Sequence, residues 1–163
     1  MALYEEHYDG LARLARLLVR DPSTAEDVVQ DAFVRLYGAW GRVREPEKAP
    51  AYLRTTVVNL ARGRHRRQVI ADRFRPERAP DAVSAEEVAV DLESQRQVIA
   101  ALDRLSARQR ECVVLRHYAG LSESEIAAVA GCSIGSVRTH VKRGMAALEV
   151  QLAVHAVGAK ESA

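Results

Sequence analysis

Residues 122–148 read SESEIAAVAGCSIGSVRTHVKRGMAAL and predict two short helices joined by a tight turn. Ser122 and Glu125 have the spacing of a capping box, in which each side chain accepts a backbone N–H at a helix start. Gly131 can adopt the left-handed backbone that ends a helix, and Ser133 can cap the next helix. We therefore expect this stretch to fold as a helix-turn-helix.

The second of these helices has one apolar face and one basic face. Its apolar residues recur at spacings of three and four and share the buried side: Ile134, Val137, Val141, Met145 and Leu148. The rest of its surface carries hydrogen-bonding groups and cations without an acid among them: Ser136, Arg138, Thr139, His140, Lys142 and Arg143. Such side chains can contact base edges and phosphates in the major groove. An ordinary solvated face is the alternative, but the short first helix and the glycine turn favour DNA binding.

The composition is that of a helical globular protein. The chain has 163 residues, 48% of them hydrophobic, with few Gly and Pro and no alternating strand pattern. That length allows one domain or two small ones. No apolar run approaches the roughly 18 residues of a membrane helix, and the N-terminal MALYEEHYDG is acidic where a signal peptide is basic. We therefore expect no membrane insertion and a cytoplasmic protein.

The sequence shows no pattern typical of a catalytic or metal site. Cys112 and Cys132 are too few and too isolated for a disulfide framework or a zinc site, and we expect buried free thiols. The nearest candidate pair is Cys112 with His117, expected in the core and on the surface respectively. We therefore predict no catalytic residue, no bound metal and no cofactor.

The first third of the chain predicts two antiparallel helices. Tyr4, Leu11 and Leu18 belong to a helical apolar pattern that stops at Asp21-Pro22. A second capping box, Ser23-x-x-Glu26, is expected to start the next helix, whose wide apolar stripe continues to Trp40. The polar side of that helix includes Asp27, Gln30 and Asp31, which the pattern alone treats as a solvated face.

A third helix is expected from Ala51, after a polar loop over residues 41–50. Its end is strongly basic, with Asn59 on a polar side before the run Arg62–Arg67. Such an end can hold phosphates of a nucleic acid. It can equally be a solvated helix terminus that compensates the helix dipole, and the residues leave both open.

Charge and periodicity divide the chain into two parts. Between residues 42 and 78 there are eleven Lys and Arg against four Asp and Glu, whereas residues 81–93 hold five acids and no base. We therefore expect an all-α fold of two small helical domains, residues 1–71 and 92–153, joined by a flexible linker at 72–91. Residues 154–163 are expected to fray.

Three segments carry a resemblance to a known family. AEDVVQDAFVRLYGAW (25–40) resembles region 2.1–2.2 of the extracytoplasmic-function (group IV) sigma-70 factors, and AYLRTTVVNLARGRHRR (51–67) resembles region 2.3–2.4. LSARQRECVVLRHYAGLSESEIAAVAGCSIGSVRTHVKRGMAALE (105–149) is similar to region 4. That last segment also resembles LuxR-type output domains, so it is the region 2 segments that distinguish the sigma-70 family from the LuxR type. His140 and Lys142 depart from the usual pattern.

The resemblance implies a transcription initiation factor with a region 2 bundle and a region 4 helix-turn-helix. It implies core RNA polymerase as partner, through its β′ clamp and β flap, together with promoter DNA and an anti-sigma factor as a candidate partner. Asp27, Gln30 and Asp31 match positions that contact the β′ clamp. Asn59 matches a position that contacts a flipped base of the −10 element. The arginines that match contacts to nearby phosphates are Arg62, Arg64, Arg66 and Arg67. Arg138, Thr139, Lys142 and Arg143 match positions that contact the −35 element, and Ser136 and His140 on the same helix complete the predicted −35 set.

A rival hypothesis is a stand-alone helix-turn-helix regulator that acts as a dimer without touching polymerase. The linker and the single helix-turn-helix would permit it. A pull-down with core polymerase distinguishes the two classes.

Overall fold

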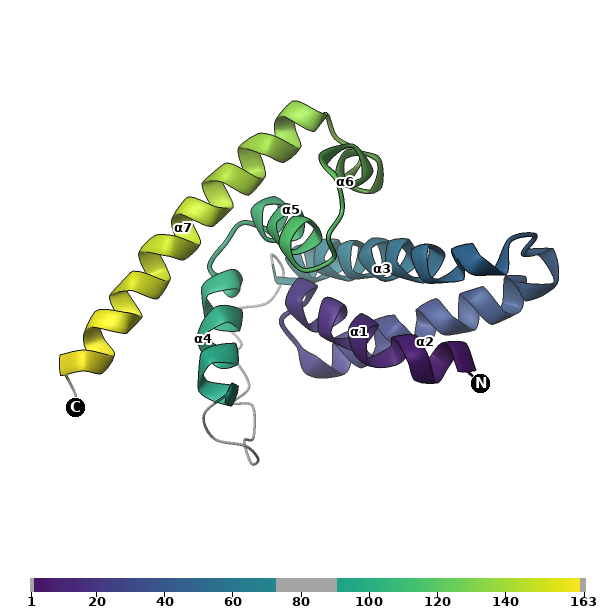
Figure 1. Cartoon of the computed structure of the whole chain (residues 1–163), viewed down its shortest axis with the longest axis horizontal. Coiled ribbons are helices and arrows are strands. Elements are labelled where there is room, and N and C mark those ends of the chain that lie inside the picture. The colour runs from purple at the N-terminus through teal and green to yellow at the C-terminus, as the bar shows by residue number, and fades with distance from the viewer. Residues whose placement is uncertain (1, 73–90, 162–163) are drawn as a thin grey trace. The chain divides into compact units, whose positions relative to one another are not determined.

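The computed structural model describes residues 2–72 and 91–161, which form seven α-helices, two single-turn 3₁₀ helices and short connections (Figure 1). None of these residues forms a strand, as the all-α prediction requires. The chain divides into two compact units, with the boundary between residues 78 and 79. Nearly all of the predicted linker, 72–91, lies outside the described residues. No described helix has the length and apolar content needed to cross a membrane.

The N-terminal unit is a bundle of three helices that each contact the other two. They are α1 (Ala2–Leu18), α2 (Pro22–Ala39) and α3 (Ala49–Asp72). The loop expected to be irregular contains two 3₁₀ turns, Trp40–Arg42 and Pro46–Lys48, and α3 begins two residues earlier than predicted.

The apolar stripes of the three helices meet in one core. Leu14 of α1, Val28 and Val29 of α2, and Leu53 and Val57 of α3 are all at most 2% exposed. Burial of a side chain of this size contributes about 1.5–3 kcal/mol. Because the core uses one side of α2 and of α3, the polar side of each remains at the surface.

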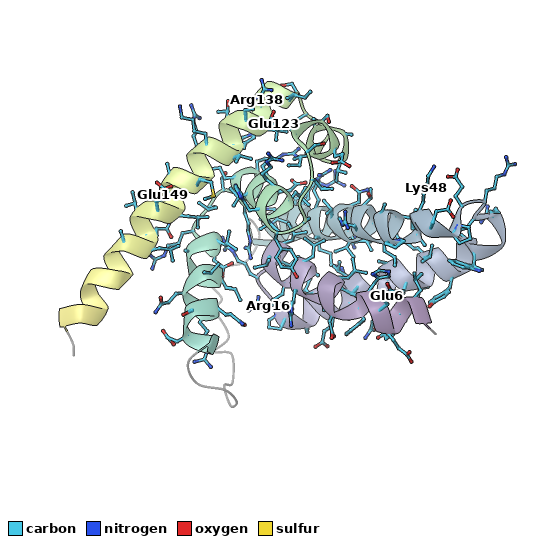
Figure 2. The ribbon with its side chains drawn as sticks, in the orientation of Figure 1. Glu6, Arg16, Lys48, Glu123, Arg138 and Glu149 are labelled. Carbon is cyan, nitrogen blue, oxygen red and sulfur yellow. The ribbon has the colours of Figure 1, made fainter. Side chains whose placement is uncertain are left out.

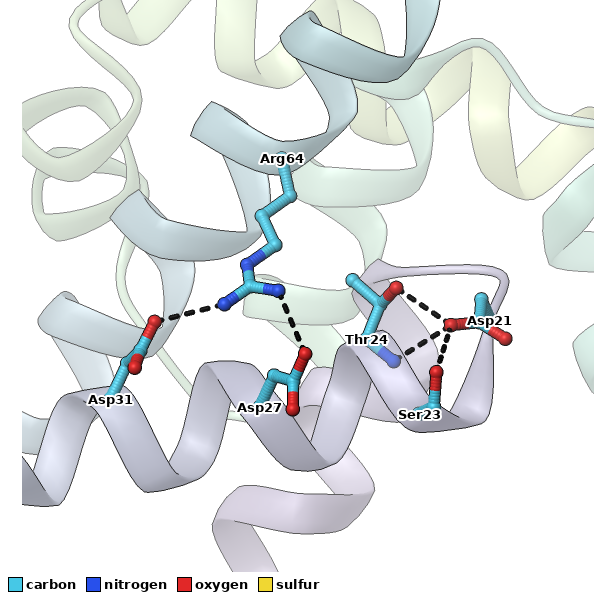
Figure 3. A network of polar contacts seen from close by, with 6 residues as sticks. All are labelled: Asp21, Ser23, Thr24, Asp27, Asp31 and Arg64. Atoms are coloured by element: carbon cyan, nitrogen blue, oxygen red, sulfur yellow. Dashed lines mark hydrogen bonds and ion pairs between the residues drawn. The ribbon is translucent and has the colours of Figure 1, made fainter.

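The start of α2 differs from the predicted capping box at Ser23 and Glu26. Asp21 caps the helix instead, and Pro22 takes the first helical position, where its missing N–H costs nothing. The Asp21 carboxylate accepts from the Thr24 backbone N–H at 2.7 Å and from the hydroxyls of Thr24 and Ser23 at 2.6 and 2.8 Å (Figure 3). These bonds, the one from the Thr24 hydroxyl first, hold the pKa of Asp21 below its ordinary value.

The C-terminal unit has four helices: α4 (Asp91–Asp103), α5 (Ala107–His117), α6 (Glu123–Ala130) and α7 (Ile134–Glu161). Helix α7 packs against the other three. Ser122 and Glu125 form the predicted capping box, and Gly131 ends α6 with φ 63° and ψ 42°. The predicted helix-turn-helix is thus α6 and the start of α7.

Helix α7 approaches α5 closely at Gly144. A Cβ added there would lie 2.6 Å from Cγ2 of Val113, so only glycine fits without movement. Val137 and Leu148 of the predicted apolar stripe are buried, but Ile134 is 41% exposed at the first turn. Helix α7 continues to Glu161, beyond the predicted domain end at 153.

The two cysteines are free thiols. Cys112 is fully buried in α5, as expected, whereas Cys132 is only half-buried because it lies in the turn between α6 and α7. Its backbone N–H donates to the carbonyl of Ala127 at 3.1 Å and so helps to close the turn.

Candidate nucleic-acid and partner interfaces

The polar side of α2 presents two carboxylates one helical turn apart. Asp27 and Asp31 lie at positions i and i+4, and their side chains are 60% and 51% exposed. Gln30 lies beside them and is exposed. The sequence-predicted partner residues therefore form one continuous surface, which we call the acidic ridge (Asp27, Gln30 and Asp31).

Arg64 of α3 bridges the two carboxylates of the acidic ridge (Figure 3). Its Nη1 lies 3.1 Å from Oδ2 of Asp27, and its Nη2 lies 2.9 Å from Oδ2 of Asp31. The planar guanidinium suits this task because its two terminal nitrogens diverge in a fixed fork. One residue predicted for −10 DNA and two predicted for the polymerase thus belong to a single network.

The other predicted −10 residues lie elsewhere on α3. Asn59, Arg62 and Arg66 recur at three and four residues and share one side of the helix, whereas Arg64 is turned toward α2. Asn59, Arg66 and Arg67 are exposed, and Arg62 is half-buried. The structure therefore places Asn59, Arg62 and Arg66 on one side of α3 and Arg64 on another, while Arg67, three residues after Arg64, lies between the two sides.

A row of aromatic rings joins α1 to the far end of α2. Ring centroids are 4.8 Å apart for Tyr4 and Tyr8 and for Tyr4 and Phe33, then 6.2 Å from Phe33 to Tyr37 and 6.4 Å from Tyr37 to Trp40. Burial, followed by the neighbouring Tyr4, raises the pKa of Tyr8. Tyr37 and Trp40 are 46% and 41% exposed. The sequence pattern placed these rings only in apolar stripes, although the spacing of four within Tyr4/Tyr8 and Phe33/Tyr37, and of three from Tyr37 to Trp40, already indicated a row on each helix.

In the C-terminal unit, the predicted −35 residues lie on the first turns of α7. Arg138, Thr139, Lys142 and Arg143 are exposed, while Ser136 and His140 are half-buried. The Thr139 hydroxyl donates to the carbonyl of Gly135 at 3.0 Å, so its lone pairs alone face outward. We call residues 134–143 the recognition helix.

An acid from the neighbouring helix reaches this basic face. Glu123, the first residue of α6, accepts from Nε of Arg138 with Oε2 at 2.7 Å (Figure 2). The charge pattern of the recognition helix alone does not predict this contact, because the acid belongs to α6. The two residues stand fifteen positions apart.

Both units match family models. Residues 3–69 match the model described as Sigma-70 region 2, and residues 95–148 match the one described as Sigma-70, region 4. These matches cover nearly all of α1 to α3 in the first unit, and most of α4, all of α5 and α6 and the first half of α7 in the second.

Curated proteins and solved structures agree with these matches. The RNA polymerase sigma-E factor of Streptomyces avermitilis is 35% identical over 144 residues, covering 88% of this chain and 79% of that protein. The ECF RNA polymerase sigma factor SigL of Mycobacterium tuberculosis is 33% identical, covering 93% and 87%. The sigma factor RpoE of Bartonella quintana, solved in complex with the anti-sigma factor NepR, has a TM-score of 0.71 and 26% identity, covering 94% of this chain and 98% of that one.

Proposed function

The chain belongs to the extracytoplasmic-function branch of the sigma-70 family, and we propose on that premise how its own residues divide the work of a sigma factor. The protein is a transcription initiation factor, not an enzyme: it binds core RNA polymerase and directs it to promoters. The prediction from the sequence is thereby confirmed. The rival hypothesis of a stand-alone regulator fails, because residues 3–69 match region 2.

The acidic ridge is our proposed contact with the β′ clamp, and its bridged geometry is the observation that carries this assignment. Asp27 and Asp31 each give one oxygen, Oδ2, to Arg64. The second oxygen of each carboxylate remains available to cationic donors of a partner. Arg64 fixes the two carboxylates relative to each other, so less side-chain freedom is lost when a partner binds.

The −10 element is assigned to the exposed side of α3. Asn59 supplies an amide that can hydrogen-bond a base edge, and Arg62, Arg66 and Arg67 supply cations for phosphates. Arg64 serves the acidic ridge instead, because both of its terminal nitrogens are already bonded to carboxylates. This division changes one member of the −10 set predicted from the sequence.

The recognition helix is our proposed contact with the −35 element. Lys142 and Arg143 project cations from its exposed side, and Ser136, Thr139 and His140 add hydrogen-bonding groups. The same unit is the proposed contact with the β flap. A protein with these two partners works in the cytoplasm, where transcription takes place. The complex of the Bartonella relative with NepR supports an anti-sigma factor as a third partner.

Three variants test this division with the full chain and core polymerase. Asp27→Asn/Asp31→Asn should reduce co-purification with core, Asn59→Ala should spare core binding but reduce open-complex formation, and Lys142→Ala should weaken promoter binding. Run-off transcription over genomic fragments measures the combined result. If Asn59→Ala and the double variant had the same defect at the same step, the division between α2 and α3 would be wrong.

A further inference from the structure

The pair of Glu123 and Arg138 ties the start of α6 to the recognition helix. Only Nε of the guanidinium is used in this bond, at 2.7 Å from the carboxylate. Arg138 is 68% exposed and Glu123 34%, so the cation stands outside and the acid behind it. Figure 2 shows both side chains where α6 meets the beginning of α7.

We propose that Glu123 is a positioning residue that makes Arg138 the reader of one guanine in the upstream promoter element. The inference rests on the proposed function of the recognition helix and adds a specificity determinant to it. Glu123 holds Nε and thereby directs the two Nη groups of Arg138 outward as a fork.

The geometry of the guanidinium supports this role. Arginine has five N–H donors in a plane, one on Nε and four on the two Nη atoms. Among the described residues nothing is bonded to either Nη of Arg138. A guanine presents O6 and N7 in the major groove as a pair of acceptors that match two such donors. An arginine already held at Nε also has fewer rotamers to lose on binding.

The charge of the pair favours a base over a phosphate. A phosphate that approached Arg138 would also approach the carboxylate of Glu123, and like charges repel. Since the carboxylate partly neutralises the cation, Arg138 releases few counterions when DNA binds. Lys142 has no acidic partner among the described residues and is therefore better suited to holding phosphate.

The test uses holoenzyme assembled from the full chain and core RNA polymerase. Promoters that this holoenzyme binds are selected from a library randomised over the upstream element. Its affinity for non-specific DNA is measured separately as a function of salt concentration. Arg138→Ala should lose about tenfold of the preference for guanine at one base pair, with little change in the salt slope. Glu123→Ala should reduce the same preference several-fold, yet bind non-specific DNA more tightly and steepen the salt slope by about one.

Two further variants separate positioning from folding and from charge. Glu123→Gln keeps an acceptor oxygen for Nε, so it should retain most of the guanine preference while showing the steeper salt slope. Glu149→Ala removes an exposed acid farther along α7 and should leave the base preference unchanged (Figure 2). Circular dichroism of the full chain verifies that α6 is still folded.

The inference is overturned if Glu123→Ala keeps the full guanine preference. It is also overturned if Arg138→Ala weakens all sequences alike and flattens the salt slope by about one, the behaviour of a phosphate contact. A holoenzyme with no preference anywhere in the upstream element would instead refute the proposed role of the recognition helix itself.

Discussion

The two units place their functional charges in different ways. In the N-terminal unit, Arg64 of α3 lies between Asp27 and Asp31 of α2, so the charge surface is built from two helices. In the C-terminal unit, the proposed DNA-contacting cations follow one another on the recognition helix, and one acid from α6 reaches them. A surface carried by one helix follows from local periodicity, whereas a surface shared by two helices depends on how the bundle packs.

That difference has a consequence for mutations. A change at Lys142 or Arg143 of the recognition helix removes one proposed contact with DNA. A change on the acidic ridge removes a proposed contact with the polymerase and also the link between α2 and α3. Each exposed ion pair of this kind is worth only about 0.2–1 kcal/mol, so loss of the link alone should not unfold the bundle.

The largest effect is expected from Asp27→Lys/Asp31→Lys. The double variant places two cations beside Arg64 and toward any cationic surface of the β′ clamp, and like charges in contact cost several kcal/mol. We expect core binding to weaken by roughly 100-fold or more, measured by fluorescence titration with core polymerase.

Glu5→Lys/Glu6→Lys makes the same change of net charge at exposed positions of α1 and should leave core binding nearly unchanged. Circular dichroism should stay helical for both double variants. Normal holoenzyme assembly by Asp27→Lys/Asp31→Lys would remove the acidic ridge from the interface.

The sequence predicted the helices and their ends more accurately than it predicted the contacts between helices. The helix-turn-helix followed from Ser122, Glu125 and Gly131, because capping and left-handed backbone are local effects. The contacts of Arg64 span 33 and 37 residues and appear only when α3 packs on α2. The cap of α2 was misassigned for another reason: both Asp21 and Ser23 are good cap residues, and Pro22, which favours the first helical position, indicates Asp21.

The next largest effect is expected from Gly144→Ala, which tests packing in the C-terminal unit. The new methyl group would lie 2.6 Å from Cγ2 of Val113, a stiff β-branched side chain, so α7 must shift on α5. Overpacking of this kind costs about 1–3 kcal/mol, which chemical denaturation should detect. Gly135→Ala is the matched control on the same helix, because its Cβ would meet only Oγ of Ser133 at 3.9 Å. Equal stability of the two variants would show that α5 and α7 are less closely packed.

A comparable but purely functional effect is expected from Arg143→Ala. Arg143 is exposed on the recognition helix one turn after Thr139, so its loss should cost about 1–3 kcal/mol at the cognate −35 element and relax preference at one base pair. Lys142→Ala should weaken all sequences alike and lower the salt slope by about one. Equal, sequence-blind effects of both changes would mean that a different side of α7 enters the groove.

A smaller effect is expected from Asp21→Ala at neutral pH. The variant removes the cap of α2 while leaving the distant contacts of Arg64 in place. Loss of a helix cap costs about 1 kcal/mol, measured as a shift in the urea midpoint. Ser23→Ala removes one donor to Asp21 but not the cap and should cost less. A larger loss for Ser23→Ala would restore the capping box predicted from the sequence.

The smallest effect is the pH dependence of the difference in stability between the wild type and Asp21→Ala. Because the pKa of Asp21 in the folded protein lies below the unfolded value of 3.8, the unfolded state binds more protons between the two values, and stability rises with pH there. The contribution of the cap is therefore present above the unfolded pKa and is lost as pH falls through the folded pKa. Urea titrations from about pH 7 down to about pH 3 should show a difference in unfolding free energy between the wild type and Asp21→Ala that is constant over most of this range and shrinks at the acid end. Asp21→Asn keeps an acceptor oxygen but cannot titrate, so the difference in stability between Asp21→Asn and Asp21→Ala should not change with pH in this range. If the difference in stability between the wild type and Asp21→Ala stayed constant to the lowest pH, the carboxylate charge would contribute nothing to the cap.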